Sequence, residues 1–340
     1  MKTNKLSIAI LLGALFLVSC EKEIEFKGEE TDPKLVINSL VEPGRPIKAN
    51  ITKSYFFLDN NPSTAVPDDL VATLYVNGHL VGEMTRQIDT IIVDYEYVDI
   101  DSVKPVYSMV PIFVNEYRPN PGDVVTITAS ANGYDDVEAS TSPLPNTASW
   151  SVGNYHVSHW EMSFYEPYYE EEDTSWYIQG TIELTVEIAD PNPGETNYFK
   201  MHIETGGITD YETGTTYYIT ATYDDPVFGG TNVGGIDLPM GAEGVFTDVL
   251  FDGRSYQIKV PLDLYVSYTS QTAPDILRMP ITMEHLTKEY YYYLNTCEQA
   301  SEIMQLFSEP VQTYTNVEGG YGLVGGRCSD TLWFEMPLTR

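Results

Sequence analysis

Strict alternation of apolar and polar side chains is the feature that most limits how this chain can fold. In Thr181–Ile188, Ile, Leu, Val and Ile at every second position alternate with Thr, Glu, Thr and Glu. Successive side chains of a β-strand point to opposite faces, so this segment predicts a strand with one buried and one wet face. Short runs broken by Gly, Pro, Asn and Asp recur along the chain and predict a mainly β protein.

Residues 34–145 predict an antiparallel sandwich of the immunoglobulin-like or transthyretin-like kind. Leu70–Val76 and Leu80–Thr85 flank Asn77-Gly78, which favours a tight hairpin because both residues tolerate the positive φ of a type I′ turn. Ser142–Asn146 is the expected exit linker. Four further strands are expected at Lys34–Leu40, Pro46–Phe57, Val124–Ala129 and Val137–Thr141.

Residues 146–340 predict a second β-rich domain. The strand Thr181–Ile188 is expected to pair with Tyr198–Glu204 in a hairpin around the acidic turn Asp190–Glu195. The Gly-rich segment 319–326 lacks the Lys of a phosphate loop, so we expect a final strand there that approaches a neighbouring element closely. Further strands are expected at Tyr217–Tyr223, Ser255–Pro261, Leu264–Ser270 and Ile276–His285.

One helix is expected within this second domain, at about residues 287–304. Thr287 is the expected N-cap, with Glu289 in the first turn. We interpret one face, whose members recur at spacings of three and four, as packing against the core, with a ligand platform as the alternative. That face consists of Leu286, Tyr290, Tyr293, Cys297, Ala300 and Met304.

The N-terminus predicts a bacterial lipoprotein signal peptide over residues 1–19. Lys2 and Lys5 precede an apolar run, Leu6–Val18, that is shorter than the roughly 20 residues needed to span a bilayer. Leu17-Val18-Ser19-Cys20 then predicts cleavage before Cys20 and acylation of its thiol, palmitate included. An ordinary secretory peptide is the alternative. Lipid on Cys20 would anchor the protein to a membrane through a charged tether over residues 20–33.

The charge balance limits the partners of the chain. Its 340 residues carry 50 acids and 18 bases, a formal net charge of −32. Such a surface repels nucleic acid and anionic headgroups, which we exclude as partners of the protein surface, and leaves cationic ligands and basic peptides. Cys297 and Cys328 are not in a CxxC pair and the five histidines show no HExxH spacing, so no transition-metal site is expected. The two cysteines form either one disulfide or two free thiols.

Aromatic residues beside acids provide the candidate ligand sites. Phe164–Asp173 and Tyr211–Phe228 combine both kinds of side chain, which suit sugar rings or peptide side chains with cationic groups. The alternative is that these tyrosines cover the sandwich edge. The candidate ligand-binding residues are Tyr165, Tyr168, Tyr169, Tyr217, Tyr218 and Tyr223.

Calcium is the one cofactor that the sequence leaves open. Asp59–Asn61, Asp94–Asp101 and Asp190–Glu195 offer oxygen ligands, although none matches the twelve-residue EF-hand loop. For catalysis, neither GxSxG nor GxxxxGK[ST] occurs, so we expect a protein that is not an enzyme.

Several segments, taken in order along the chain, resemble the Bacteroidetes lipoprotein family known as domain of unknown function 4249. They are CEKEIEF, KLVINSLVEPGRP, EIADPNPGETNYFKMHI, FTDVLFDGRSYQIKV, KEYYYYLNTCEQA and FSEPVQTYTNVEGGYGLVGG. The resemblance implies a lipoprotein of the outer membrane that faces the cell exterior and is commonly encoded beside TonB-dependent receptors. Cys297 and Cys328 are departures from the family pattern.

These features together predict a non-enzymatic, surface-exposed lipoprotein that acts as an accessory, ligand-binding subunit of a TonB-dependent uptake system. The ligand would be a glycan or a peptide. A structural or adhesive cell-surface protein is the alternative, and a glycan or peptide hydrolase is a third, less favoured hypothesis.

Overall fold

The structure is a computed structural model that describes most of the chain after Asp32. The described residues are 32–55, 65, 67–99, 102–165, 175–204, 206–210, 215–229, 231–233, 236–238, 242–269, 276–300 and 312–337. The chain divides into two units, Met1–Asp32 and Pro33–Arg340, and all elements below belong to the second. The expected signal peptide, Cys20 and nearly all of the tether lie outside the described residues.

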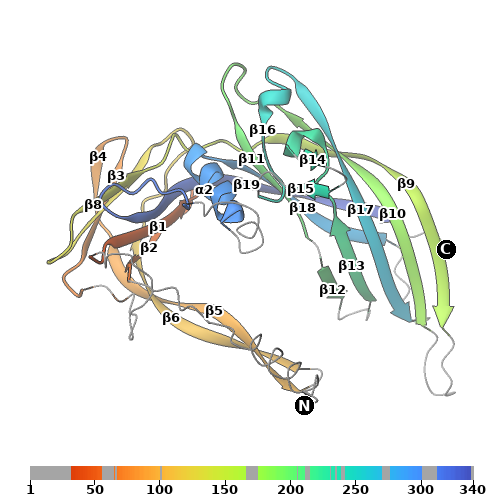
Figure 1. Ribbon diagram of the computed structural model, residues 1–340, viewed down its shortest axis with the longest axis horizontal. Helices are drawn as coiled ribbons and strands as arrows, with labels where there is room; N and C mark the ends of the chain where they lie inside the picture. Colours follow the sequence, from red (N-terminus) through yellow and green to blue (C-terminus); the bar gives the residue numbers. More distant parts are fainter. Residues whose placement is uncertain are drawn as a thin grey trace, which may run out of the picture. The chain divides into compact units, whose positions relative to one another are not determined.

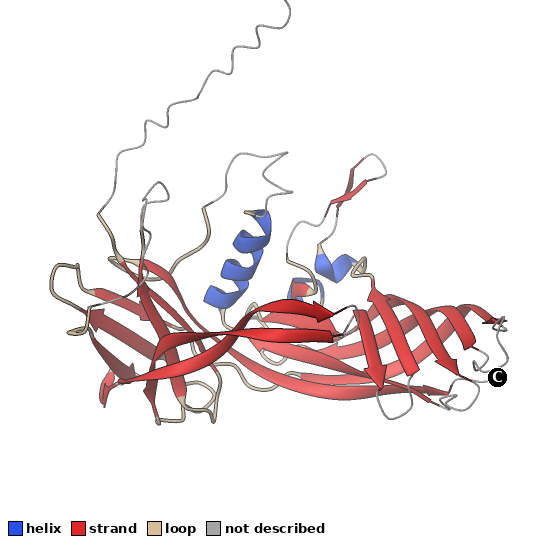
Figure 2. Ribbon diagram, turned by 90° about the horizontal axis from the view of Figure 1, so that it is seen from below, coloured by secondary structure: helices blue, strands red, loops and turns tan. Residues whose placement is uncertain are grey.

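Three antiparallel or mixed sheets and a small hairpin account for nearly all regular structure (Figures 1 and 2). The eight-stranded sheet, in the order β16-β11-β18-β19-β1-β2-β6-β5, contains β1 (Leu35–Val41), β2 (Ile47–Lys53), β5 (Thr85–Asp99), β6 (Ser102–Asn115), β11 (Tyr198–Ile203), β16 (Val245–Thr247), β18 (Ile276–Leu286) and β19 (Tyr321–Pro337). The five-stranded sheet, in the order β12-β13-β17-β10-β9, contains β9 (Ser149–Tyr165), β10 (Ser175–Ala189), β12 (Gly206–Asp210), β13 (Thr215–Ala221) and β17 (Ser255–Thr269).

The remaining elements are short. The four-stranded sheet, in the order β4-β3-β7-β8, contains β3 (Val71–Val76), β4 (His79–Glu83), β7 (Val125–Ser130) and β8 (Val137–Ser140). The others are the hairpin β14 (Thr231–Val233) and β15 (Ile236–Leu238), the 3₁₀ turns η1 (Pro226–Phe228) and η2 (Asp248–Leu250), and the helix α2 (Lys288–Gln299). This content of the described residues confirms the expected fold class, mainly β with one α-helix.

The expected N-terminal sandwich is present. Alternate residues of β1 and β2, such as Ile37 and Ile51, are fully buried in one cluster with Leu74 of β3 and Ile127 of β7. The β3–β4 hairpin turns through Asn77 and Gly78 at φ 51° and 75°, as the Asn-Gly pair predicted.

A second core lies between the five-stranded sheet and the other half of the eight-stranded sheet. Leu184 of β10 and Leu262 of β17 contribute to one side, and Phe199 of β11 and Met283 of β18 to the other. Strand β10 shows the expected alternation, because Ile182, Leu184, Val186 and Ile188 are all buried.

Strand β19 contributes to both cores. Its first part pairs in parallel with β1, from Val36↔Tyr321 to Val41↔Gly326, and places Val324 in the N-terminal core. Its second part pairs with β18 and places Phe334 in the other core. A Cβ on Gly322, at φ 109°, would collide with the carbonyl of Ile37, which confirms the close approach expected of the Gly-rich segment. The domain boundary at residue 145 stays a prediction.

The expected hairpin between Thr181–Ile188 and Tyr198–Glu204 is wrong. Strand β10 pairs with β9 and β17 in one sheet, whereas β11 pairs with β16 and β18 in the other. The chain changes sheets at the intervening turn, in which Asp190 accepts the backbone N–H groups of Asn192 and Gly253 at 2.8 and 2.6 Å. The two strands expected at Ser255–Pro261 and Leu264–Ser270 are one strand, β17, which runs through Pro261.

The helix begins where expected but ends at Gln299 rather than at 304. Thr287 is the N-cap, yet its hydroxyl makes no capping bond and instead accepts the N–H of Gly326 at 2.9 Å. Leu286 of the expected core-packing face is buried, but it ends β18 and is not part of the helix. No residue of the helix itself is fully buried. Tyr291 packs on β11, with its ring centroid 4.8 Å from that of Tyr198. Met304 lies outside the described residues.

Candidate functional site

Three tyrosines form a continuous row on the outer face of the five-stranded sheet. Tyr177, Tyr265 and Tyr218 come from the neighbouring strands β10, β17 and β13. The ring centroids of Tyr177 and Tyr265 are 5.8 Å apart, and those of Tyr265 and Tyr218 are 5.9 Å apart. We call these three residues the tyrosine face.

The period of two along each strand determines this position. Leu264 and Val266 are buried on either side of Tyr265, and Ile219 and Ile178 are buried next to Tyr218 and Tyr177. Tyr218 lies directly opposite Tyr265 in the register, whereas Tyr177 lies opposite Ser267 and reaches Tyr265 diagonally. The rings therefore stand on a sheet whose other side is core.

Two of the three rings are well exposed. Tyr218 is 51% exposed and Tyr265 is 36% exposed, whereas Tyr177 is half-buried. Burial, together with the neighbouring Tyr177 and Tyr218, raises the pKa of Tyr265 above its ordinary value. The phenol of Tyr265 can therefore donate a hydrogen bond, while the three rings offer flat apolar surfaces.

Two carboxylates lie beside the tyrosine face. Asp263 precedes Tyr265 by two positions on β17, and its Oδ1 accepts the hydroxyl of Thr181 at 2.8 Å. Glu161 of β9 lies opposite Gln179 of β10, whose side chain is exposed beside the rings. The arrangement combines aromatic surface, an amide and carboxylate oxygens on one rigid sheet.

The structure brings only one of the predicted ligand tyrosines to this face, Tyr218. Tyr217 is on the opposite side of β13, where it packs against the core, and Tyr223 also packs there. The Tyr223 hydroxyl accepts the N–H of Ile203 at 3.1 Å, and burial raises its pKa to about 12. Tyr217 and Tyr223 thus have a packing role, and ligand binding by either one stays a prediction.

Three of the predicted ligand tyrosines cannot be placed. Tyr165 ends β9, but its side chain lies outside the described residues, as do Tyr168 and Tyr169 entirely. Sequence reasoning missed Tyr177 and Tyr265. Tyr265 lies between two buried residues and Tyr177 precedes one, which was the available signal, but only the strand register brings them together.

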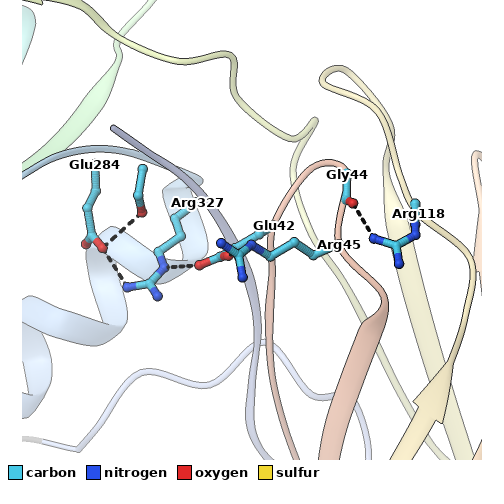
Figure 3. Close-up of polar contacts among 7 residues, drawn as sticks. Glu42, Gly44, Arg45, Arg118, Glu284 and Arg327 are labelled. Carbon is cyan, nitrogen blue, oxygen red and sulfur yellow. Dashed lines mark hydrogen bonds and ion pairs between the residues drawn. The ribbon is translucent and has the colours of Figure 1, made fainter. Parts of the chain in front are cut away.

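A cluster of charges around Arg327 has a structural role (Figure 3). Its guanidinium bonds Glu42 at 2.7 Å and Glu284 at 2.5 Å, and Ser329 also donates to Glu284. Burial alone would lower the pKa of Arg327, but the hydrogen bond to Glu42 and the charges of Glu284 and Glu42 raise it. Because this partly buried group is satisfied within the chain, it joins β19 to β18 and to the β1–β2 turn.

A polar pocket of about 480 Å³ lies where the Ser142–Asn146 segment meets the end of β18. His285 lines it, with Nδ1 at 2.9 Å from the carbonyl oxygen of Asn146, and burial lowers its pKa. This pocket is separate from the tyrosine face, since it shares no residue with it.

The cysteines do not form the disulfide that was one alternative. Cys297 and Cys328 are both free. Cys297 of α2 lines a pocket of about 440 Å³ together with Met201 and Tyr223, whereas Cys328 of β19 lies 3.3 Å from the hydroxyl of Thr147. The two thiols therefore lie in different surroundings.

The stretches considered for calcium are mostly engaged in other contacts or cannot be placed. The carboxylate of Asp190 binds backbone N–H groups of the turn described above, and Asp94 and Asp99 belong to β5. Asp59–Asn61 and Asp101 lie outside the described residues. Within the described ranges, no group of three or more His, Cys, Asp or Glu side chains is placed to hold a metal ion. Among the same residues, no helix has the length and apolar character to cross a bilayer.

Comparison with known proteins gives weak structural similarities. The T6 backbone pilin of serotype M6 Streptococcus pyogenes is 9% identical, at a TM-score of 0.14; the match covers 89% of this chain and 64% of that chain, less than two thirds. The collagen adhesin of S. aureus is 9% identical, with coverage of 91% and 95% and a TM-score of 0.10.

The collagen binding domain of the Erysipelothrix rhusiopathiae surface protein RspB is 11% identical, with coverage of 88% and 96% and a TM-score of 0.12. Similarity at these TM-scores carries no argument about function. No curated protein matches the sequence.

The family comparison is decisive. Residues 21–331 match the family model described as Domain of unknown function (DUF4249), over nearly the whole of the chain that follows Cys20. The six segments that suggested this resemblance all overlap the match. The chain therefore belongs to the DUF4249 family.

Proposed function

We propose that this protein is a lipid-anchored surface protein that captures a ligand on the tyrosine face and presents it to a TonB-dependent outer-membrane receptor. The observation that carries the proposal is the row of three neighbouring tyrosine rings on one sheet, two of them well exposed. Contiguous apolar surface patches, unlike single exposed residues, often mark binding sites.

The chemistry of the face supports binding rather than catalysis. Tyrosine offers a large contact area and has few rotatable bonds, so little conformational entropy is lost when a ligand binds. The rings are further fixed because their strands are buried on the inner side. Aromatic surfaces and hydroxyl groups of this kind bind a ligand without needing to break its bonds, and we propose a non-enzymatic role.

Sequence features support the location and the partner. Leu17-Val18-Ser19-Cys20 supports acylation of Cys20, and the charged residues after it support a tether that holds the folded part away from the membrane. The resemblance of the chain to Bacteroidetes lipoproteins supports exposure on the outer face of the outer membrane. The same resemblance supports a TonB-dependent receptor as partner.

Purification of the tagged protein from its native outer membrane in mild detergent tests this role. We expect a TonB-dependent receptor to copurify in a constant ratio, as identified by mass spectrometry. A Cys20→Ala variant should lose both incorporation of a palmitate analogue and membrane association. Purification without any receptor would contradict the uptake role and favour the structural or adhesive alternative.

A further inference from the structure

We propose that the tyrosine face binds a cationic peptide segment, with Lys or Arg side chains over the rings and near the flanking carboxylates. This inference rests on the proposed function, since it names the chemical class of the captured ligand. The aromatic row and its charged surroundings are independent observations, and both favour a cation.

The spacing of the rings fits an extended peptide. In an extended strand, alternate side chains lie on one side and are about 6.6–6.8 Å apart. The centroid separations of 5.8 and 5.9 Å are close to this repeat, so alternate cationic side chains can reach successive rings. A guanidinium or ammonium group over a tyrosine face is attracted by the negative potential of the ring.

The charges beside the rings are negative, and none of the described Lys or Arg side chains forms an ion pair with them. Asp263 accepts a hydrogen bond from the neutral Thr181 hydroxyl. The cation nearest to Glu161 is His159, at 3.9 Å, which carries charge only when protonated. Glu183, further along the same face, differs because Lys259 neutralises it at 2.8 Å. The two carboxylates beside the tyrosines are therefore available to a cationic ligand, whereas Glu183 is already paired.

The charge of the whole chain acts in the same direction. A formal net charge of −32 attracts cations from solution and repels anionic ligands. This field is not specific to one place, so it raises the association rate without selecting the tyrosine face. Selection must come from the rings and from the two local carboxylates, and the experiment has to separate these contributions.

Calorimetric titration of the full mature protein in non-ionic detergent tests the proposal. The probe is the peptide acetyl-Gly-Lys-Gly-Lys-Gly-Lys-Gly amide, and its matched control replaces each Lys by Gln. Cellohexaose and maltohexaose serve as uncharged glycan probes. We expect binding of the Lys peptide, weaker at high salt, and no measurable binding of the Gln peptide or of either glycan.

Paired variants assign the binding to the face. Tyr218→Ala and Tyr265→Ala should each weaken Lys-peptide binding about three- to fivefold, whereas Tyr218→Phe should stay within about twofold because the ring remains. Tyr107→Ala, at an exposed tyrosine of β6, is the control for lost aromatic area. Asp263→Asn should weaken binding, and Glu187→Gln, an exposed acid at the other end of β10, should not.

Three results would overturn the proposal. Equal losses for Asp263→Asn and Glu187→Gln would mean that the general field binds the peptide. Unchanged binding by the folded Tyr218→Ala and Tyr265→Ala variants would place the site elsewhere. Glycan binding that depends on these tyrosines would replace the peptide by a sugar. None of these results bears on receptor copurification, so failure of the ligand class is distinguishable from failure of the proposed function.

Discussion

The tyrosine face and the β5–β6 ribbon both expose apolar side chains, but they differ in what lies beneath. We define the ribbon as residues 87–99 of β5 and residues 102–112 of β6. In this part β6, which pairs with β2 as far as Phe113, pairs only with β5. There Ile88 and Met109 are 63% and 78% exposed. The strands of the tyrosine face instead have a fully buried inner side.

This difference shows that exposure alone does not define a binding platform. A two-stranded ribbon without a core is only marginally stable, so its side chains are held weakly relative to one another. The tyrosines are held by a five-stranded sheet packed on a second sheet. A preformed site loses less entropy on binding, which is why we place the ligand on the tyrosine face.

The largest expected contrast is in the response to truncation of an apolar side chain. Leu262→Ala, in the fully buried inner side of β17, should lower the free energy of unfolding by about 2–5 kcal/mol. Ile92→Ala, on the ribbon, should change it by less than about 0.5 kcal/mol. Urea denaturation measures both, and similar losses would mean that the ribbon is packed in the native protein.

Hydrogen exchange should show the same contrast without mutation. Amides of β17, hydrogen-bonded on both sides by β10 and β13, should exchange only through global unfolding. Amides of the ribbon should exchange on the order of a hundredfold faster, through local opening. Equal protection of the two regions would contradict the comparison.

The free energy of unfolding should depend on pH through His285. This residue is on β18, in the sheet that packs against the inner side of the tyrosine-bearing sheet. Burial lowers the pKa of His285 in the folded state below about 6.5, the ordinary value that applies when the chain is unfolded. The unfolded chain therefore binds the proton first, so this contribution is complete above about pH 6.5 and is lost as the pH falls through the folded pKa.

A His285→Gln variant tests this contribution. Its free energy of unfolding should vary less between neutral and mildly acidic pH than that of the unmodified protein, when both are measured by urea denaturation. Identical pH profiles would show that His285 does not have a lowered pKa in the folded state.

The smallest expected effect is on the stability of the tyrosine face itself. Tyr218→Ala removes a half-exposed ring and should change the free energy of unfolding by less than about 0.5 kcal/mol. This near-neutral result would support a role in binding rather than in packing. A loss several times larger in thermal or urea denaturation would indicate that the row mainly stabilises the sheet.

The sequence predicted elements whose signals are local. The Asn77-Gly78 turn and the alternation in Thr181–Ile188 depend on backbone preference and on burial, so the hairpin and the buried residues were predictable. The partners of β10 and β11 were not, because they are strands distant in the sequence. A turn motif in the sequence does not indicate which sheet the next strand joins.

The candidate site was only partly predictable for the same reason. Tyr218 was a candidate because it lies in an aromatic, acidic stretch, whereas Tyr177 and Tyr265 lie in different stretches. Their proximity is a consequence of strand register, which involves contacts between distant residues. The hydroxyl of Thr287 binding Gly326 is another such contact.

The parallel pairing of β1 with β19 has a consequence for the order in which the protein folds during synthesis. The ion pair between Glu42 and Arg327 joins residues that are 285 positions apart, and Val324 contributes to the N-terminal core. The core of the N-terminal sandwich is therefore complete only when the end of the chain is available. Such long-range contacts slow folding. A chain that ends before Tyr321 would lack β19, so its N-terminal sandwich would be destabilised together with its C-terminal part.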